Sequence, residues 1–311
     1  MSFSLPWLRS QSKGDPLFRW IALVSAFVIP LLMAGILVEL IRHSSLAMRE
    51  FGFGFLTTNV WNPVTEEYGA LSSIFGTAAS TLIAMLIALP LGLVIAVFLV
   101  ELAPPKLSAL FGTAIELLAA IPSIIYGMWG LFIFAPFLSN HIYPVLGKHL
   151  GFLPLFSGPP MGIGILTAGI ILAFMILPYI SSVTRDIIHM VPPVVKEAAY
   201  GVGATNWEVT RGVTLRYSLR GIVGAAFLGL GRALGETMAV TFVIGNDHKI
   251  GASLFASGNT IASTLANEFS EASEPLYLSA LVELGLVLFV MTVIFQAAAQ
   301  IWLWSIRKKL A

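Results

Sequence analysis

The sequence contains no cysteine, and this absence excludes disulfide bonds, thiolate metal sites and cysteine nucleophiles together. It also has no Walker A motif, no G-x-S-x-G motif and no H-E-x-x-H motif, so we do not expect the chain alone to hydrolyse a nucleotide. We expect no metal site and no cofactor, because the five histidines lack the spacing of metal ligands: His43, His141, His149, His189 and His248.

Charged residues are scarce as well. They make up 11% of the 311 residues, against about 25% in a typical soluble domain. Hydrophobic residues make up 57%, and the mean hydropathy is +0.90. This composition indicates an integral membrane protein that lies in a lipid bilayer. The net charge of +1 gives no reason to expect a nucleic-acid partner.

Long apolar runs are abundant, and a run of about 20 residues is enough for a transmembrane helix. We predict an all-α polytopic membrane protein with six such helices, and a loop rich in Gly, Pro and His at 139–160. We divide the chain into an N-terminal region (1–71), a core of spans two to six (72–305) that includes a loop at 184–219, and a basic tail (306–311). The expected spans are about 18–41, 72–100, 110–138, 161–183, 221–246 and 276–304.

The distribution of Lys and Arg predicts the orientation of the chain. Cytoplasmic segments of membrane proteins carry an excess of these residues. If the N-terminus is cytoplasmic, 12 of the 17 lie in cytoplasmic segments, 4 lie outside, and Arg232 lies within a span. Both termini are therefore expected in the cytoplasm.

The fifth expected span, Gly221 to Asn246, carries two charges near its middle. A charged side chain at a helix centre costs roughly 2.5–3.5 kcal/mol on insertion, and such residues usually face a bundle interior or a watery path. On one continuous helix Arg232 and Glu236 share a face, because they are four residues apart. That face also carries small or polar residues, which predict space for a polar solute beside the helix: Gly221, Ala225, Gly229, Ala239 and Asn246.

Two structural interpretations compete with this one. Arg232 and Glu236 would simply neutralise each other as an ion pair, or the small residues would serve close helix packing in small-xxx-small patterns. Two further acids, Glu116 and Glu283, lie in expected spans. Each lies near a span end or can turn toward a neighbouring helix, so we expect structural roles for both.

The loop at 184–219 contains signals for two short helices. Pro192-Pro193 favours a helix start, a helix is expected over 194–200, and Gly201 and Gly203 end it. Thr205 or Asn206 then caps a second helix that runs through Val209. The loop also carries apolar residues that favour a docking projection over a plain solvated connector: Val194, Val195, Ala198, Ala199, Trp207 and Val209. Further along, Asn259-Thr260 is expected to cap a helix at 261–269.

The same loop resembles a known motif. Glu197-Ala198-Ala199, followed by Gly203 and then by Val213 and Leu215, resembles the EAA loop in permeases of binding-protein-dependent ABC importers. The sequence departs from that pattern at Val213, where the family has isoleucine, and at Arg216, where the family has proline. The stretch from Gly229 to Asn246, together with Asn259-Thr260, Ala266-Asn267-Glu268-Phe269 and Glu283-Leu284-Gly285, closely resembles phosphate ABC transporter permeases of the PstC type.

This resemblance implies a type I ABC importer permease fold in a bacterial inner membrane. It also implies a second homologous permease, two ATP-binding subunits and an external phosphate-binding protein as partners, with inorganic phosphate as the substrate. Glu197, Ala198, Ala199 and Gly203 would seat in a cleft of an ATP-binding subunit. Arg232, Glu236 and Asn246 would line the substrate path.

Two other functions stay open at this point. One is a permease for another oxyanion, such as sulfate, molybdate or phosphonate. The other is a secondary transporter, which would be expected to have inverted repeats and no docking loop. The EAA pattern weighs against the secondary transporter.

Overall fold

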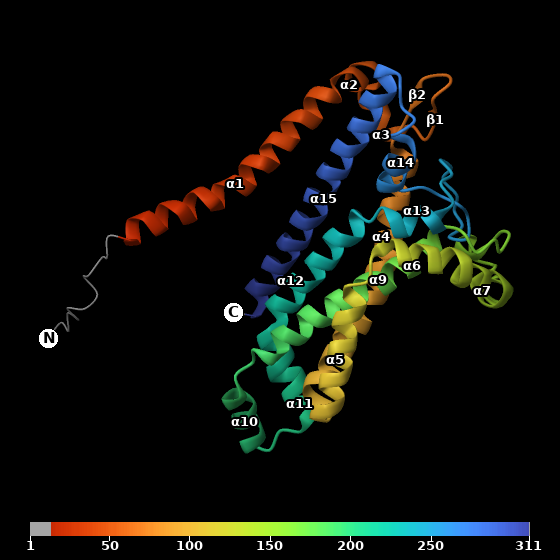
Figure 1. Ribbon diagram of the computed structural model, residues 1–311. Coiled ribbons are helices and arrows are strands. Elements are labelled where there is room, and N and C mark those ends of the chain that lie inside the picture. The colour runs from red at the N-terminus through yellow and green to blue at the C-terminus, as the bar shows by residue number, and fades with distance from the viewer. Residues whose placement is uncertain (1–13, 311) are drawn as a thin grey trace.

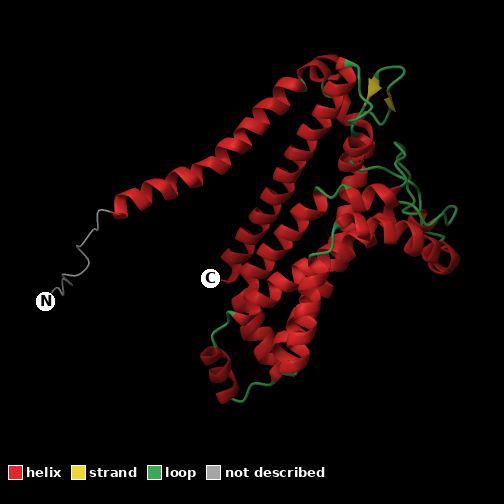
Figure 2. Ribbon diagram, in the orientation of Figure 1, coloured by secondary structure: helices red, strands yellow, loops and turns green. Residues whose placement is uncertain are grey.

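The computed structural model describes the backbone of residues 14–310 and the side chains of residues 16–301. These residues are mostly helical (Figures 1 and 2). The longer helices are α1 (Gly14–His43), α4 (Leu71–Val97), α5 (Pro105–Ala119), α9 (Ile165–His189), α12 (Leu215–Leu234) and α15 (Pro275–Leu310). The shorter helices are α2 (Ser45–Phe51), α3 (Gly54–Thr57), α6 (Ser123–Trp129), α7 (Ala135–Phe137), α8 (Tyr143–Leu150), α10 (Pro193–Gly201), α11 (Asn206–Val209), α13 (Met238–Ile244) and α14 (Ile261–Glu268).

Short segments complete the described chain. Strands β1 (Trp61–Asn62) and β2 (Glu67–Tyr68) form an antiparallel hairpin in which Trp61 lies opposite Tyr68. A 3₁₀ turn, η5 (Pro154–Phe156), precedes α9. Four π-helical turns join helices, namely η2 (Phe98–Leu102), η3 (Gly130–Phe134), η4 (Leu138–Ile142) and η6 (Thr210–Thr214).

The prediction of six membrane spans is confirmed. Within the described residues, five helical stretches are long and apolar enough to cross a membrane, and a bent helix pair supplies the sixth. The five are Pro16–His43, Leu71–Leu102, Ser123–Leu150, Ile165–His189 and Pro275–Ile301, and the bent pair is Asn206–Leu234 with Met238–Ile244.

The predicted third span, 110–138 with a loop after it, is wrong in its boundaries. Helix α5 ends at Ala119, and the chain is helical again from Ser123 through Leu150. The break falls before Pro122, which lacks an N–H and disfavours helical geometry in the residue before it. Residues 139–150 remain helical because Pro144 lies in the first turn of α8, where proline is tolerated.

Helices α4 and α9 form the centre of the bundle. Glycines allow the two helices to approach closely, since a Cβ on Gly169 would lie 2.6 Å from Ile83, and one on Gly92 would lie 3.1 Å from Ile180. Lipid tails are as apolar as leucine, so such close packing, rather than escape from water, holds membrane helices together. This pair is the scaffold on which α12 and α13 are placed.

The two ends of the bundle carry different structures. Helices α10 and α11 project at one end, while α2, α3, the β1–β2 hairpin and α14 gather at the other (Figure 1). Helix α1 extends away from the bundle, and the most apolar part of its span buries none of its residues. Over most of its length, its apolar side chains therefore remain exposed to the surroundings rather than covered by the other described residues.

Candidate functional site

The candidate pathway segment is a broken helix. Helix α12 ends at Leu234, α13 begins at Met238, and their axes differ by 59°. The prediction of one continuous helix from Gly221 to Asn246 is therefore wrong. The break falls at Gly235, a residue type that destabilises helix interiors by about 1 kcal/mol relative to alanine. Broken membrane helices occur where the irregular backbone lines a cavity or is buried in protein.

Glu236 holds the second half of the break. Its carboxylate Oε1 accepts a hydrogen bond from the backbone N–H of Ala239 at 3.1 Å, in the first turn of α13. A carboxylate at this place satisfies a free helix N–H and is favoured by the helix dipole. Thr237 closes the turn by donating its hydroxyl to the carbonyl of Gly235 at 3.3 Å.

Arg232 lies in the last turn of α12, where a cation is favoured by the helix dipole. Its side chain is exposed in this chain, and among residues 16–301 it forms no ion pair within 4 Å. The alternative in which Arg232 and Glu236 neutralise each other is therefore not what the structure contains. Arg232 is an exposed cation beside a helix break, and Glu236 belongs to the start of α13.

The small residues of α12 do not leave space beside the charged residue. A Cβ on Gly229 would lie 2.6 Å from Ile180, and one on Gly221 would lie 2.5 Å from Ile187, both on α9. The expectation that these glycines line an open charged face is thus wrong, and the packing alternative holds for them. They bring α12 against α9, while Arg232 remains exposed.

Asn246 lies at the other end of α13 from Arg232 and Glu236. It has a left-handed backbone with φ of 53° and follows Gly245 at φ of 98°. Its side-chain amide donates to the carbonyl of Thr241 at 3.0 Å, which helps to end the helix. Because the seven residues of α13 span about 10 Å, Asn246 is not in one constellation with Arg232.

Asn246 lines a separate pocket at the hairpin end of the bundle. The pocket has a volume of about 390 Å³ and is bordered by Asn59, Val60, Trp61, Asn246, Asp247, His248 and Lys249. The charges of Lys249 and Asp247 partly offset each other, with 3.7 Å between Nζ and Oδ2.

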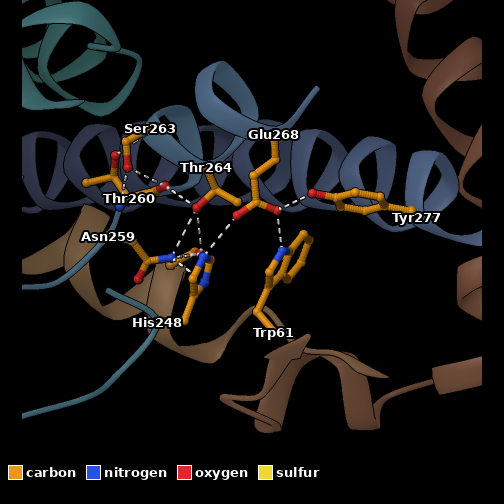
Figure 3. Close-up of polar contacts among 9 residues, drawn as sticks. Trp61, His248, Asn259, Thr260, Ser263, Thr264, Glu268 and Tyr277 are labelled. Carbon is orange, nitrogen blue, oxygen red and sulfur yellow. Dashed lines mark hydrogen bonds and ion pairs between the residues drawn. The ribbon is translucent and has the colours of Figure 1, made fainter. Parts of the chain in front are cut away.

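A polar cluster that the sequence did not predict lies next to this pocket (Figure 3). We call Trp61, His248, Glu268 and Tyr277 the Glu268 cluster. The Glu268 carboxylate accepts hydrogen bonds from Trp61 Nε1, from the Tyr277 hydroxyl at 2.8 Å, and from His248 Nε2 at 3.1 Å. The His248 ring stacks on Trp61, with 5.5 Å between ring centroids and 7° between planes.

The electrostatics of Glu268 follow from these contacts. Burial alone raises the pKa of this carboxyl. The hydrogen bonds from His248, Tyr277 and Trp61, together with the charge of His248, outweigh burial and hold the pKa of Glu268 below its ordinary value of 4.5. Glu268 is therefore ionised at neutral pH and connects the hairpin, the segment after α13, α14 and α15.

The predicted cap of α14 supports the same region. Thr260 accepts a hydrogen bond from the Ser263 N–H at 3.0 Å, and the Ser263 hydroxyl in turn accepts one from the Thr260 N–H at 2.8 Å. This confirms the helix start predicted at Asn259-Thr260. Asn259 donates its side-chain amide to Ser73 of α4 at 2.6 Å and contacts His248 Nδ1 at 3.0 Å.

At the opposite end, the two short helices predicted in the 184–219 loop are confirmed. Helix α10 runs from Pro193 to Gly201, and α11 begins after Thr205, which forms a capping box with Glu208. Gly203 makes the bend with φ of 91°, a conformation that favours glycine. Glu197 and Ala198 are exposed, and Ala199 is half-buried. Apolar residues around them are also exposed, namely Val194, Val195, Val202 and Trp207.

The remaining acids of the spans have identifiable surroundings. Glu116 accepts a hydrogen bond from Arg185 at 2.5 Å and ties α5 to α9, in agreement with the structural role predicted for it. Glu283 is 6% exposed and lines an apolar pocket of about 490 Å³ between α2, α3, α4 and α15. Its Oε2 atom has no hydrogen-bond partner among the described side chains.

Sequence comparison places most of the chain in one family. Residues 88–302 match the family described as "Binding-protein-dependent transport system inner membrane component". The phosphate transport system permease protein PstC of Mesorhizobium japonicum is 52% identical over 303 residues, which cover 96% of this chain and 93% of that protein. The protein named PstC 2 of Mycobacterium tuberculosis is 38% identical over 301 residues, covering 94% and 93%.

Solved structures of similar fold are more distant in sequence. A permease chain of the MetNI methionine ABC transporter, in an inward-facing conformation, superposes with a TM-score of 0.57 at 18% identity, covering 79% of this chain and 99% of that chain. A chain of a bacterial alginate ABC transporter superposes with a TM-score of 0.60 at 16% identity, covering 92% and 95%. These likenesses support the type I importer permease fold. The chain is a multi-pass inner-membrane protein that belongs to the family of binding-protein-dependent transport system inner membrane components, in the group of PstC phosphate permeases.

Proposed function

We propose that this chain is the transmembrane subunit of an ATP-driven importer that moves inorganic phosphate into the cell. The observation that carries the proposal is the exposed guanidinium of Arg232 beside a break in a membrane-spanning helix. The similarity to phosphate permeases over nearly the whole chain supports the choice of phosphate. ATP hydrolysis belongs to partner subunits.

Arg232 attracts the phosphate anion during passage. A guanidinium offers a planar fork of donors that suits phosphate oxygens, and it stays charged at every working pH. Because no carboxylate among the described residues neutralises Arg232, its donors are available to a passing anion. Glu236 is close to Arg232 in sequence, and its first role is to accept the hydrogen bond from the Ala239 N–H. Its second role is to limit how tightly the phosphate anion is retained near Arg232.

The orientation proposed for the chain places both termini in the cytoplasm. The distribution of Lys and Arg supports it, because the end of the bundle that carries α10 and α11 is also rich in these residues. The β1–β2 hairpin, α14 and the Glu268 cluster then lie at the external side, where a phosphate-binding protein would deliver its ligand. Asn246 would lie on the path between that side and Arg232.

The proposed assembly contains two homologous permeases and two ATP-binding subunits. Arg232 is exposed when this chain is considered by itself. A second permease is therefore needed to shield the guanidinium from lipid and to complete the path. Helix α10 would seat in a cleft of an ATP-binding subunit, with Glu197, Ala198, Ala199 and Gly203 at the contact. Apolar side chains on and next to α10 are exposed, which supports a protein partner for this helix.

The role of Arg232 is tested by replacing it in the assembled complex. Arg232→Ala is expected to abolish phosphate uptake while the subunits still co-purify, because the side chain is exposed and forms no ion pair among residues 16–301. Arg49→Ala, which removes an exposed arginine of α2, serves as the control and is expected to retain uptake. Uptake at the wild-type rate in Arg232→Ala would refute the proposed role.

The role of α10 is tested separately with the charge of Glu197. Glu197→Lys is expected to uncouple ATP hydrolysis from uptake, because it reverses charge at the proposed contact. Glu197→Gln, which keeps the side-chain size, is expected to be milder. The measurement is phosphate transported per ATP hydrolysed in proteoliposomes, and normal coupling in Glu197→Lys would count against docking through this residue.

The substrate is tested on the co-purified complex with the binding protein present. Phosphate is expected to stimulate ATPase activity, and sulfate, molybdate and phosphonate are not expected to compete for uptake. Stimulation by one of those anions instead would assign another oxyanion. Uptake driven by an ion gradient without any ATP-binding subunit would assign a secondary transporter.

A further inference from the structure

One ion pair joins α10 to the body of the bundle. Lys196 Nζ donates to Glu101 Oε1 at 2.6 Å, and the two side chains are only 19% and 9% exposed. Among the described ion pairs this one is the least exposed. Lys196 and Ala199 form the half-buried side of α10, whereas the neighbouring Glu197 is exposed. Lys196 therefore faces the bundle while the proposed docking residue faces away from it.

Such a pair fixes position better than it adds stability. Removing two charges from water offsets most of their attraction, so a buried ion pair contributes little net stability, although a short charge-assisted hydrogen bond constrains geometry. Glu101 lies in the π-helical turn η2, directly after α4. Turns of this kind are frequent at functional sites. Lys196 thus links α10 to the end of α4.

The other end of α4 is linked to the segment that holds the Glu268 cluster. Ser73 accepts a hydrogen bond from the Asn259 amide at 2.6 Å, and Thr77 Oγ1 accepts one from the Ile261 N–H at 3.0 Å. The backbone approach is also close, because a Cβ on Gly76 would overlap the carbonyl oxygen of Asn259. Asn259 in turn contacts His248 of the Glu268 cluster (Figure 3).

Between these two ends, α4 is one continuous helix from Leu71 to Val97. It contains Pro90, but it packs against α9 on both sides of that residue, through Ile83 and through Gly92. Packed helices that cannot bend independently move as units. A displacement applied at η2 is therefore carried to Ser73 and Thr77.

We propose that α4 transmits movement from α10 to the external end of the bundle, and that the Lys196–Glu101 ion pair is the joint through which the movement enters. The inference rests on the proposed function, in which α10 receives force from an ATP-binding subunit. Lys196 and Glu101 are positioning residues in this scheme and touch no substrate. The Glu268 cluster is the part that α4 moves.

The absence of cysteine makes a direct test straightforward. Cysteines replace Asn206 in α11, which is not among the proposed docking residues, and Val64 in the hairpin; both are exposed, and each is spin-labelled in the complete complex. The distance distribution between the two spin labels is measured by double electron–electron resonance spectroscopy, with and without ATP and vanadate. We expect a nucleotide-dependent change in the wild-type background and none in Lys196→Gln or Glu101→Gln. The reciprocal exchange, Glu101→Lys with Lys196→Glu, is expected to restore it.

Transport gives the second readout. Each single variant is expected to keep ATPase activity and to lose about tenfold in phosphate moved per ATP, the size of an ordinary coupling energy. Glu116→Gln, which breaks the ion pair with Arg185 but leaves α10 linked, is the matched control and is expected to retain the wild-type ratio.

Three results would overturn the inference. The first is a nucleotide-dependent change that persists in the single variants. The second is a reciprocal exchange that behaves no better than the single variants. The third is failure of the single variants to assemble, which would make the pair a structural brace. Because the label measurement needs ATP but no phosphate, an error in the substrate assignment alone would leave this test intact.

Discussion

The Glu268 cluster allows a quantitative prediction for Glu268→Ala. The substitution removes one carboxylate that accepts hydrogen bonds from Trp61, His248 and Tyr277. A hydrogen bond to a charged group contributes about 1.5–3 kcal/mol, so three give a ceiling of about 4.5–9 kcal/mol. The side chain is still 18% exposed, and water will replace part of what is lost. We therefore expect a local destabilisation of about 3–5 kcal/mol.

The assay is hydrogen–deuterium exchange over residues 245–270. A loss of about 4 kcal/mol corresponds to roughly a thousandfold faster local opening, while helices distant from the cluster are expected to keep their protection. Glu271→Ala is the control, because Glu271 is an exposed acid one turn beyond α14. An increase of less than about tenfold over this segment in Glu268→Ala would refute the reasoning, since it would mean that each bond contributes no more than a surface contact.

Two further predictions follow from the same contacts and packing. The pKa of Glu268 is lowered in the folded protein, so its stabilisation is complete above the ordinary value of 4.5 and is lost as pH falls from there through the folded pKa. The stability difference between wild type and Glu268→Gln should thus shrink as pH falls below 4.5, as measured by thermal unfolding. Gly229→Leu should destabilise the subunit by about 1–3 kcal/mol because the new side chain overlaps Ile180, whereas Gly224→Leu, with no atom within 4 Å of its Cβ, should have little effect. Equal melting temperatures for these two variants in detergent would contradict the packing assigned to Gly229.

Features that depend on nearby residues were predictable from the sequence. The apolar runs gave the six spans because a bilayer imposes one length and one composition on any helix that crosses it. The two short helices after α9 were also predictable, since Pro193, Gly203 and Thr205 each act through the adjacent backbone. The same holds for Thr260 at the start of α14.

The break between α12 and α13 was not predicted, because its residues support two local structures. Arg232 and Glu236, four apart, are typical of a pair on a continuous helix. Gly235 followed by an acid and Thr237 is equally typical of one helix that ends and another that begins. The choice depends on α13 packing against α6 and α9, where Gly127 leaves room for Ala239. Such a tertiary contact is not visible in a local pattern.

The Glu268 cluster and the Lys196–Glu101 pair lay beyond sequence reasoning for a related reason. Trp61 and Glu268 are 207 positions apart, and Lys196 and Glu101 are 95 apart. One signal was available: Trp61 and Glu268 are residues with a strong need for polar partners when buried, and both lie in segments between spans. The sequence alone did not indicate which of several such residues would meet.

The exposed position of Arg232 has a consequence for the assembly. An unpaired guanidinium facing acyl chains would carry most of the cost of a charge in lipid, which insertion scales put at roughly 2.5–3.5 kcal/mol. The described residues supply no counter-charge, because Arg232 forms no ion pair among residues 16–301 and the Glu236 carboxylate accepts a hydrogen bond from Ala239. Relief must come from water or from another protein surface, and the second permease of the proposed assembly would provide such a surface. An exposed cation at a helix break, with no ion-pair partner among residues 16–301, is what one half of such a shared site would present under the proposed pairing of two permeases.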